Sequence, residues 1–164
     1  MLRSRSTILV FGALVATGVA LVAASHRPVA PISPPTPTAV VGLPKVLVYK
    51  SPSCGCCKKW VEHMKTAGFP VEVKDLEDVG PIKAELGVPA ALVSCHTAVV
   101  GGYLLEGHVP ADLVVNLLRD HPKVSGLAVP GMVTGSPGME GDHQDRYDVI
   151  AFDAKGGTSV YAKR

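Results

Sequence analysis

The chain has 164 residues, with 16 lysines and arginines against 14 aspartates and glutamates and a formal net charge of +2 at pH 7. Acidic and basic residues are mixed along the chain, which argues against the basic surface of a nucleic-acid-binding protein. This length suits one small domain with additional segments.

The first 25 residues have the layout of a secretory signal peptide. Arg3 and Arg5 precede an uncharged stretch over residues 8–24, and small residues follow it. Because this stretch is near the lower limit of about 17 residues for a membrane span, two alternatives stay open: a cleaved signal and an uncleaved N-terminal anchor. In both cases we expect the working part outside the cytoplasm, where free thiols are oxidised unless a partner reduces them or a metal binds them.

A proline-rich segment follows over residues 26–44 and contains six prolines with small residues between them. Proline lacks a backbone donor and favours extended structure, so we interpret this segment as a semi-rigid linker.

From residue 45 the apolar pattern alternates between strand and helix. The predicted elements are strands at 46–49 and 69–73, helices at 56–67, 79–86 and 110–118, and a hairpin of strands at 90–93 and 98–105. This α/β order, with cysteines at the first strand-to-helix junction, resembles the thioredoxin fold. The resemblance implies a thioredoxin-like domain over 45–121 and a cis Val88–Pro89 bond that faces the cysteines. The alternative is a proline that only ends the preceding helix.

Residues 122–164 form an extension that a thioredoxin domain does not need. Alternating segments at 147–152 and 158–161 flank a glycine turn and predict a β-hairpin. We expect this hairpin to hold the preceding loop against the core, so that the extension contributes to the functional site.

Three of the four cysteines, Cys54, Cys56 and Cys57, follow the first predicted strand. Cys54 and Cys57 form a C-x-x-C pair, the candidate catalytic residues of a redox protein, while Cys54 and Cys56 form a C-x-C chelate. Three sulfurs this close cannot all pair as disulfides, but as thiolates they can converge on a soft metal. Cys56 is not needed for thiol–disulfide exchange. Redox and metal chemistry both stay open at this point.

The cluster favours Cu(I) among the metals, because this ion prefers thiolate and thioether ligands. The dipole of the predicted helix, with Lys58 and Lys59, should lower the pKa of the thiols and favour the thiolate. Zinc is less well supported, since the paired C-x-x-C units of a closed tetrahedral site are absent from the sequence.

Other candidate ligands lie beyond the cluster. Met132 and Met139 each follow a glycine in a loop and could supply thioether sulfur, or could simply pack. His108 lies where the last strand of the predicted domain returns toward the cysteines, so it could be a ligand or a surface histidine.

Cys95 is harder to assign. Five or six residues of strand after Pro89 would carry it about 17–20 Å away, to the far end of the sheet. Cys95 and His96 therefore stay as candidate ligands, with a buried structural thiol as the alternative for Cys95. We expect His63 and His143 to be exposed, and Trp60 to pack behind the cluster.

A more specific resemblance covers nearly the whole predicted exported domain. The matching motifs run from the first cysteines to the methionine loop: Tyr49–Cys57 with Trp60, Gly87–Pro89, Ser94–Ala98, Gly102–Tyr103, Glu106–Ala111, Gly126–Met132 and Gly135–Met139. In these motifs the chain resembles the exported thioredoxin-like proteins of the CopG type, which are associated with copper resistance in Gram-negative bacteria. The resemblance implies copper binding at the cysteine cluster, a contribution from the segment beyond the core, and a role in copper redox handling.

The sequence therefore predicts a periplasmic copper-binding protein that cycles or sequesters Cu(I) and Cu(II). Two alternatives stay open: a thiol–disulfide oxidoreductase acting on exported proteins, and a passive Cu(I) metallochaperone. The expected partners are copper ions and a copper efflux or redox protein. We expect a monomer whose only membrane contact is the N-terminal segment, if that segment is not cleaved.

Overall fold

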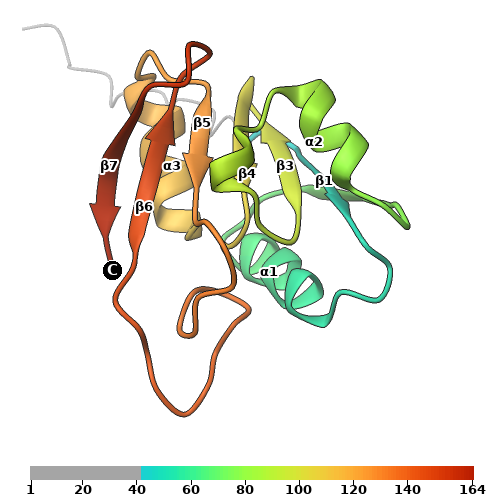
Figure 1. Ribbon diagram of the computed structural model, residues 1–164. Coiled ribbons are helices and arrows are strands. Elements are labelled where there is room, and N and C mark those ends of the chain that lie inside the picture. The colour runs from blue at the N-terminus through green and yellow to red at the C-terminus, as the bar shows by residue number, and fades with distance from the viewer. Residues whose placement is uncertain (1–41) are drawn as a thin grey trace, which may run out of the picture. The chain divides into compact units, whose positions relative to one another are not determined.

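The computed structural model describes residues 42–164; the predicted signal segment and most of the predicted linker lie outside this range. Figure 1 shows an α/β arrangement of strands and helices. In chain order the elements are β1 (Val46–Lys50), α1 (Gly55–Thr66), β2 (Val71–Asp75), α2 (Gly80–Leu86), the short 3₁₀ helix η1 (Ala90–Leu92), β3 (Thr97–Val100), β4 (Tyr103–Glu106), α3 (Ala111–Asp120), β5 (Gly126–Ala128), β6 (Asp148–Phe152) and β7 (Thr158–Lys163).

The described strands form one mixed sheet in the order β2-β1-β3-β4-β5-β6-β7. The β1–β2 and β4–β5 pairs are parallel and the other neighbours are antiparallel. Tyr49 near the end of β1 pairs with Thr97 at the start of β3, Thr97 pairs with Glu106 at the end of β4, and Glu106 pairs with Ala128 at the end of β5. The segments that follow β1, β4 and β5 and the segment that precedes β3 therefore meet at one end of the sheet.

Helices α1 and α3 share a buried core with one face of the sheet. Trp60, Met64 and Leu117 are fully buried there with Leu105 of the sheet, and burial of each such side chain is worth about 1.5–3 kcal/mol. Successive residues of a strand face opposite sides. Thr97 and Glu106 accordingly lie on the other face, where Lys83 of α2 contacts them.

The strand prediction for residues 90–93 was wrong. These residues form η1 and an irregular segment, in which the Leu92 N–H donates to the Pro89 carbonyl. A run of four apolar residues is too short to show a period, and Pro89 favours a turn. The hairpin is formed by β3 and β4, joined at Gly101 and Gly102. The prediction of a single strand at 98–105 was therefore also wrong, because a turn divides this range into two strands. The predicted helices and the strands at 46–49 and 69–73 are confirmed to within a few residues.

The extension adds strands to the same sheet. β5 was not predicted; it lies between β4 and β6, and the predicted hairpin corresponds to β6 and β7. Within residues 42–164 every peptide bond is trans, so the expectation of a cis Val88–Pro89 bond was wrong. No helix in this part of the chain has the length and apolar character needed to cross a membrane.

Candidate metal site

The N-terminus of α1 holds three of the four cysteines. Cys54 caps the helix, because its sulfur accepts a hydrogen bond of 3.3 Å from the N–H of Cys57. Cys54 and Cys57 are joined as a disulfide, while Cys56 and Cys95 are free thiols. The Sγ of Cys56 lies 3.4 Å from the Sγ of Cys54. The helix dipole places partial positive charge at this point.

Cys95 joins this group. The sulfurs of Cys54, Cys56, Cys57 and Cys95 all lie within 4.8 Å of one another. The predicted separation of Cys95 from the cluster was wrong, because it depended on a strand at residues 90–93. The chain instead reverses through η1, and Cys95 arrives at the cysteine end of the sheet two residues before β3 begins.

Two histidines contact Cys95. Its Sγ lies 2.9 Å from Nε2 of His108 and 3.3 Å from Nδ1 of His96. Nδ1 of His108 lies 2.7 Å from the carbonyl oxygen of Pro137. Because a carbonyl can only accept, Nδ1 carries the proton, and in the neutral ring Nε2 presents a lone pair toward Cys95. Burial lowers the pKa of His108 and favours this neutral form, although the Pro137 carbonyl and Glu140 oppose the shift.

His96 is fully buried beside these groups. Its ring centroid lies 4.4 Å from that of Trp60 and 5.1 Å from that of His108. Desolvation lowers the pKa of His96 well below its usual value, and repulsion from the protonated form of His108, from Lys83 and from Lys50 lowers it further. In the described part of the chain Nε2 of His96 has no hydrogen-bond partner. Cys95, His96 and His108 form a second group with ligand atoms within 4.8 Å.

The surroundings of Cys95 favour its neutral thiol in the metal-free chain. Burial raises the pKa of Cys95 to about 12, and the charge of Cys56 adds to this shift. A bound cation has the opposite effect, because it stabilises thiolates directly. The four cysteines are therefore suited to binding a metal cation.

The loop between β5 and β6 approaches α1. In Figure 1 this long connection descends beside α1. A cavity of about 410 Å³ lies there, and its lining includes Cys56, Lys59, Met139 and Glu140. Met139 is half-buried at this cavity, whereas the predicted ligand Met132 is 53% exposed and is not part of the cavity lining.

Gly138 fixes the approach of this loop. It has φ +87°, and a Cβ added to it would lie 2.7 Å from the carbonyl oxygen of Cys56 and 2.8 Å from the backbone nitrogen of Trp60. Since real Cβ atoms do not come this close to backbone atoms, only glycine fits between the loop and the first turn of α1.

Three other expectations concern Trp60, His63 and His143. Trp60 is fully buried, and its indole N–H donates to the carbonyl of Val109 at 2.9 Å. The exposed position expected for His63 was wrong: it is half-buried, its Nε2 accepts the N–H of Ala111 at 3.0 Å, and burial lowers its pKa. His143 is exposed as expected.

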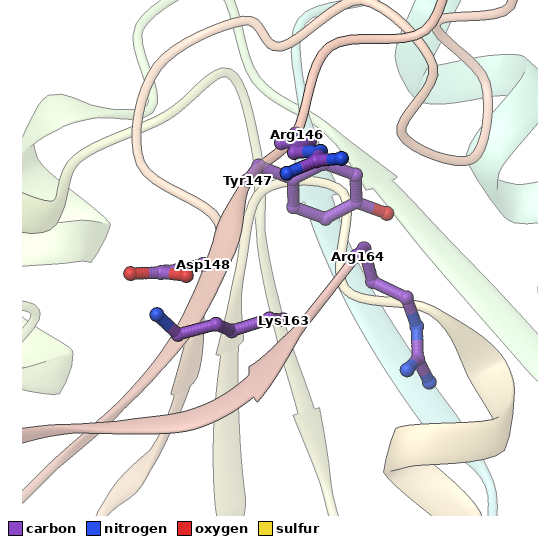
Figure 2. Close-up of a pocket in the computed structure, with 5 residues that line it drawn as sticks. All are labelled: Arg146, Tyr147, Asp148, Lys163 and Arg164. Atoms are coloured by element: carbon purple, nitrogen blue, oxygen red, sulfur yellow. The ribbon is translucent and has the colours of Figure 1, made fainter.

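A larger cavity of about 580 Å³ lies elsewhere, at the open ends of β6 and β7. Its lining residues are Arg146, Tyr147, Asp148, Lys163 and Arg164. Figure 2 shows that Arg164 points away from Lys163 and Asp148, so the charged groups do not converge on one point. This cavity contains no sulfur and no histidine, and we assign the functional site to the cysteine end of the sheet.

The donor atoms fit a soft metal ion. Four sulfurs and two imidazoles that burial keeps neutral are brought together by segments from three parts of the chain. Thiolate sulfur and neutral imidazole are ligands of Cu(I) and of other thiophilic metals. The cysteine cluster, which in the structure consists of Cys54, Cys56, Cys57 and Cys95, can therefore bind a metal ion.

The chain is similar to two solved structures titled "Copper resistance protein copG", Form 2 and Form 1. The sequence identity is 43% in both cases, and the TM-scores are 0.71 and 0.70. Each match covers 74% of this chain and 98% of the other. Residues 92–139 also match a family described as a protein of unknown function, DUF411. None of the curated proteins gives a significant match.

Proposed function

This chain belongs to the CopG family of copper resistance proteins, and we propose that it binds copper at its cysteine cluster and cycles or sequesters Cu(I) and Cu(II). The observation that carries this proposal is the convergence of four sulfurs from two separate segments. A thiol–disulfide exchanger needs two of them. Four sulfurs with adjacent neutral imidazoles match the ligand preference of Cu(I).

Individual residues have distinct parts in this proposal. Cys54, Cys56, Cys57 and Cys95 supply thiolates when the disulfide is reduced, and His108 supplies the lone pair of Nε2. The hydrogen bond from Nδ1 of His108 to Pro137 fixes that tautomer and the orientation of the ring. Met139 lies at the cavity beside Cys56, where a thioether could add to the donor set.

The disulfide gives the site a redox capacity. Oxidation of the Cys54 and Cys57 thiolates to the disulfide releases two electrons, which can reduce two Cu(II) ions to two Cu(I) ions. In the opposite direction, two Cu(I) ions can supply the electrons that reduce the disulfide. The metal ions are then the substrate of an oxidoreductase, and the disulfide found between these residues is one of its two states.

We further propose that the part from β1 to α3 is thioredoxin-like. The element order β-α-β-α-β-β-α, the strand order β2-β1-β3-β4 and a Cys54–Cys57 pair at the start of the first helix support this assignment. The signal-like N-terminus supports a periplasmic location, where copper ions and an efflux or redox protein would be the partners of a monomer.

The second candidate function is thiol–disulfide exchange with exported proteins. It is favoured by one observation, the disulfide between Cys54 and Cys57 at a helix N-terminus. Cys56 separates the two functions, because exchange does not use it whereas copper binding does.

The test compares the wild-type chain, Cys56→Ser and a triple variant with serine at positions 54, 56 and 57. Cu(I) affinity is measured by competition with a chromophoric chelator, and exchange by insulin reduction. We expect the triple variant to lose Cu(I) binding and Cys56→Ser to weaken it sharply. Strong insulin reduction together with normal Cu(I) affinity in Cys56→Ser would favour the exchange function instead.

A further inference from the structure

A buried ion pair lies behind the cysteine cluster, on the face of the sheet opposite α1. Lys83 of α2 is 4% exposed and Glu106 of β4 is fully buried, and Nζ of Lys83 lies 2.6 Å from Oε1 of Glu106. Nζ also donates to Oγ1 of Thr97 at 2.8 Å, and the Thr97 hydroxyl donates to the second carboxylate oxygen of Glu106.

The same carboxylate holds the segment that carries Cys95. Oε1 of Glu106 accepts the backbone N–H of Ser94 at 2.6 Å. The next residue after Glu106, Gly107, donates its N–H to the carbonyl of His96 at 2.9 Å. The backbone is therefore fixed on both sides of Cys95, once by the Glu106 side chain and once by the Gly107 backbone.

The close approach of these two segments depends on Gly107. A Cβ added to this residue would lie 2.5 Å from Oγ of Ser94 and 2.6 Å from the carbonyl oxygen of Val129. The following residue, His108, contacts the sulfur of Cys95 at 2.9 Å. Residues 106–108 thus set the position of Cys95 through three successive contacts.

Stability alone does not explain a buried ion pair. Replacing such a pair by apolar residues of similar volume is often neutral or stabilising, because desolvation of both charges offsets their attraction. Here the carboxylate makes a charge-assisted hydrogen bond to the backbone next to a candidate ligand. Residues that orient a ligand in this way typically change metal affinity by about 10–100-fold.

We propose that Glu106 and Lys83 are positioning residues for Cys95. Glu106 fixes the Ser94 N–H and thereby the thiol, and Lys83 balances the charge of the carboxylate. Neither residue is a ligand. The inference rests on the proposed function as far as copper is concerned, but the placement of Cys95 can be tested without metal.

The test uses two matched double variants that both remove the buried charges. Lys83→Met with Glu106→Gln keeps an acceptor for Ser94, whereas Lys83→Met with Glu106→Leu removes it. Cu(I) affinity of the purified chain is measured by chelator competition. We expect the Leu variant to bind Cu(I) about 10–100-fold more weakly than the Gln variant.

A second readout does not involve copper. With serine at positions 54, 56 and 57, Cys95 is the remaining thiol, and its alkylation by iodoacetamide can be followed by mass spectrometry. We expect alkylation about tenfold faster in the Leu variant than in the Gln variant, because the lost hydrogen bond releases the segment. Equal rates and equal affinities in the two variants would overturn the proposal.

Two further outcomes are distinguishable. If the wild type does not bind Cu(I) but the alkylation rates differ as expected, the proposed function fails and the positioning role of Glu106 stands. If the Leu double variant does not fold, Glu106→Asp replaces it, since this change keeps both charges but withdraws the carboxylate by one methylene. Unchanged alkylation in a folded Glu106→Asp variant would then overturn the proposal.

Discussion

Nε2 of His108 lies 2.9 Å from the sulfur of Cys95, although thirteen positions separate the two residues in the chain. The contact exists because β3 and β4 are antiparallel neighbours, so the residues before β3 and after β4 lie side by side. Because Cys95 also lies close to the cysteines at the N-terminus of α1, this contact connects those cysteines with the buried histidines.

Replacement of Cys95 by serine should weaken Cu(I) binding. Loss of a direct ligand should cost more than loss of an orienting group, so we expect a decrease in affinity of more than about 100-fold. Chelator competition under reducing conditions measures the effect, with His143→Ala as the control at an exposed position. An affinity within the error of the wild type would exclude Cys95 from the proposed copper site.

The oxidation state of Cys54 and Cys57 should control copper capacity. The disulfide leaves Cys56 and Cys95 as the only free thiols of the described chain, so the oxidised chain should bind Cu(I) more than about 100-fold more weakly than the reduced chain. Copper per chain is measured anaerobically after preparation in each state and removal of the reductant. Equal stoichiometry and affinity in the two states would show that the disulfide cysteines are not ligands.

The two candidate methionines should behave differently. Met139 lines the cavity next to Cys56, whereas Met132 is 53% exposed. Met139→Leu, which approximately preserves volume, should weaken Cu(I) binding by about tenfold or make the bound Cu(I) easier to oxidise. Met132→Leu should have the smaller effect. Affinity and redox potential of the two variants are compared directly. A larger effect of Met132→Leu would place the thioether donor elsewhere in the loop.

Alanine substitutions at Gly138 and Gly131 test whether the loop between β5 and β6 must contact α1. Both have positive φ, +87° and +74°, but an added Cβ at Gly131 meets nothing within 4 Å. Alanine at either position costs about 1–2 kcal/mol of backbone strain, and at Gly138 the overlap with α1 adds about 1–3 kcal/mol.

Urea denaturation of the two alanine variants measures this difference, and chelator competition measures its effect on the site. We expect Gly138→Ala to lose more stability and more Cu(I) affinity than Gly131→Ala. Indistinguishable variants would mean that the loop does not need to contact α1.

The stability of the metal-free chain should depend on pH through its buried histidines. The pKa of His96 in the fold is well below the usual value of 6.5, mainly because burial disfavours the charged ring. As pH falls below about 6.5, the unfolded chain takes up a proton that the folded chain does not, so the free energy of unfolding decreases. The lowered pKa values of His63 and His108 act in the same direction.

Urea denaturation at pH 7, 6 and 5 under reducing conditions checks this dependence. His96→Phe should reduce the slope by about one proton, or about 1.4 kcal/mol per pH unit in the steepest range. A slope unchanged by the substitution would show that His96 titrates alike in the folded and unfolded chain.

The part of the fold with clear periodicity could be predicted from the sequence. Helix α1 has Trp60, Val61 and Met64 at helical spacing, and the terminal hairpin has a glycine turn between alternating segments. β5 has three residues, too few to show a period, and its place in the sheet depends on pairing with β4. Such a strand is determined by tertiary contacts.

The candidate site was predictable only where its residues are close in sequence. The group Cys54, Cys56 and Cys57 stands out by spacing alone. The approach of Cys95 depends on whether residues 90–92 form a strand or a turn of 3₁₀ helix, a local choice that reverses the direction of the chain. Lys83 and Glu106 gave no sequence signal, because charged residues are usually exposed and only the fold shows that these two are buried together.

Under the proposed function, the assembly of the Cys54, Cys56, Cys57 and Cys95 sulfurs from two distant segments links metal occupancy to the lifetime of the protein. An unfolded chain retains the three neighbouring cysteines but not the fourth, so copper should bind the folded form more tightly and shift the folding equilibrium by mass action. Once the site is close to saturation, each tenfold rise in free copper adds about 1.4 kcal/mol to the free energy of unfolding, as long as the unfolded chain stays unloaded. Proteases that degrade transiently unfolded molecules would then remove the empty protein faster than the loaded one, so its abundance would follow the copper supply without any change in synthesis.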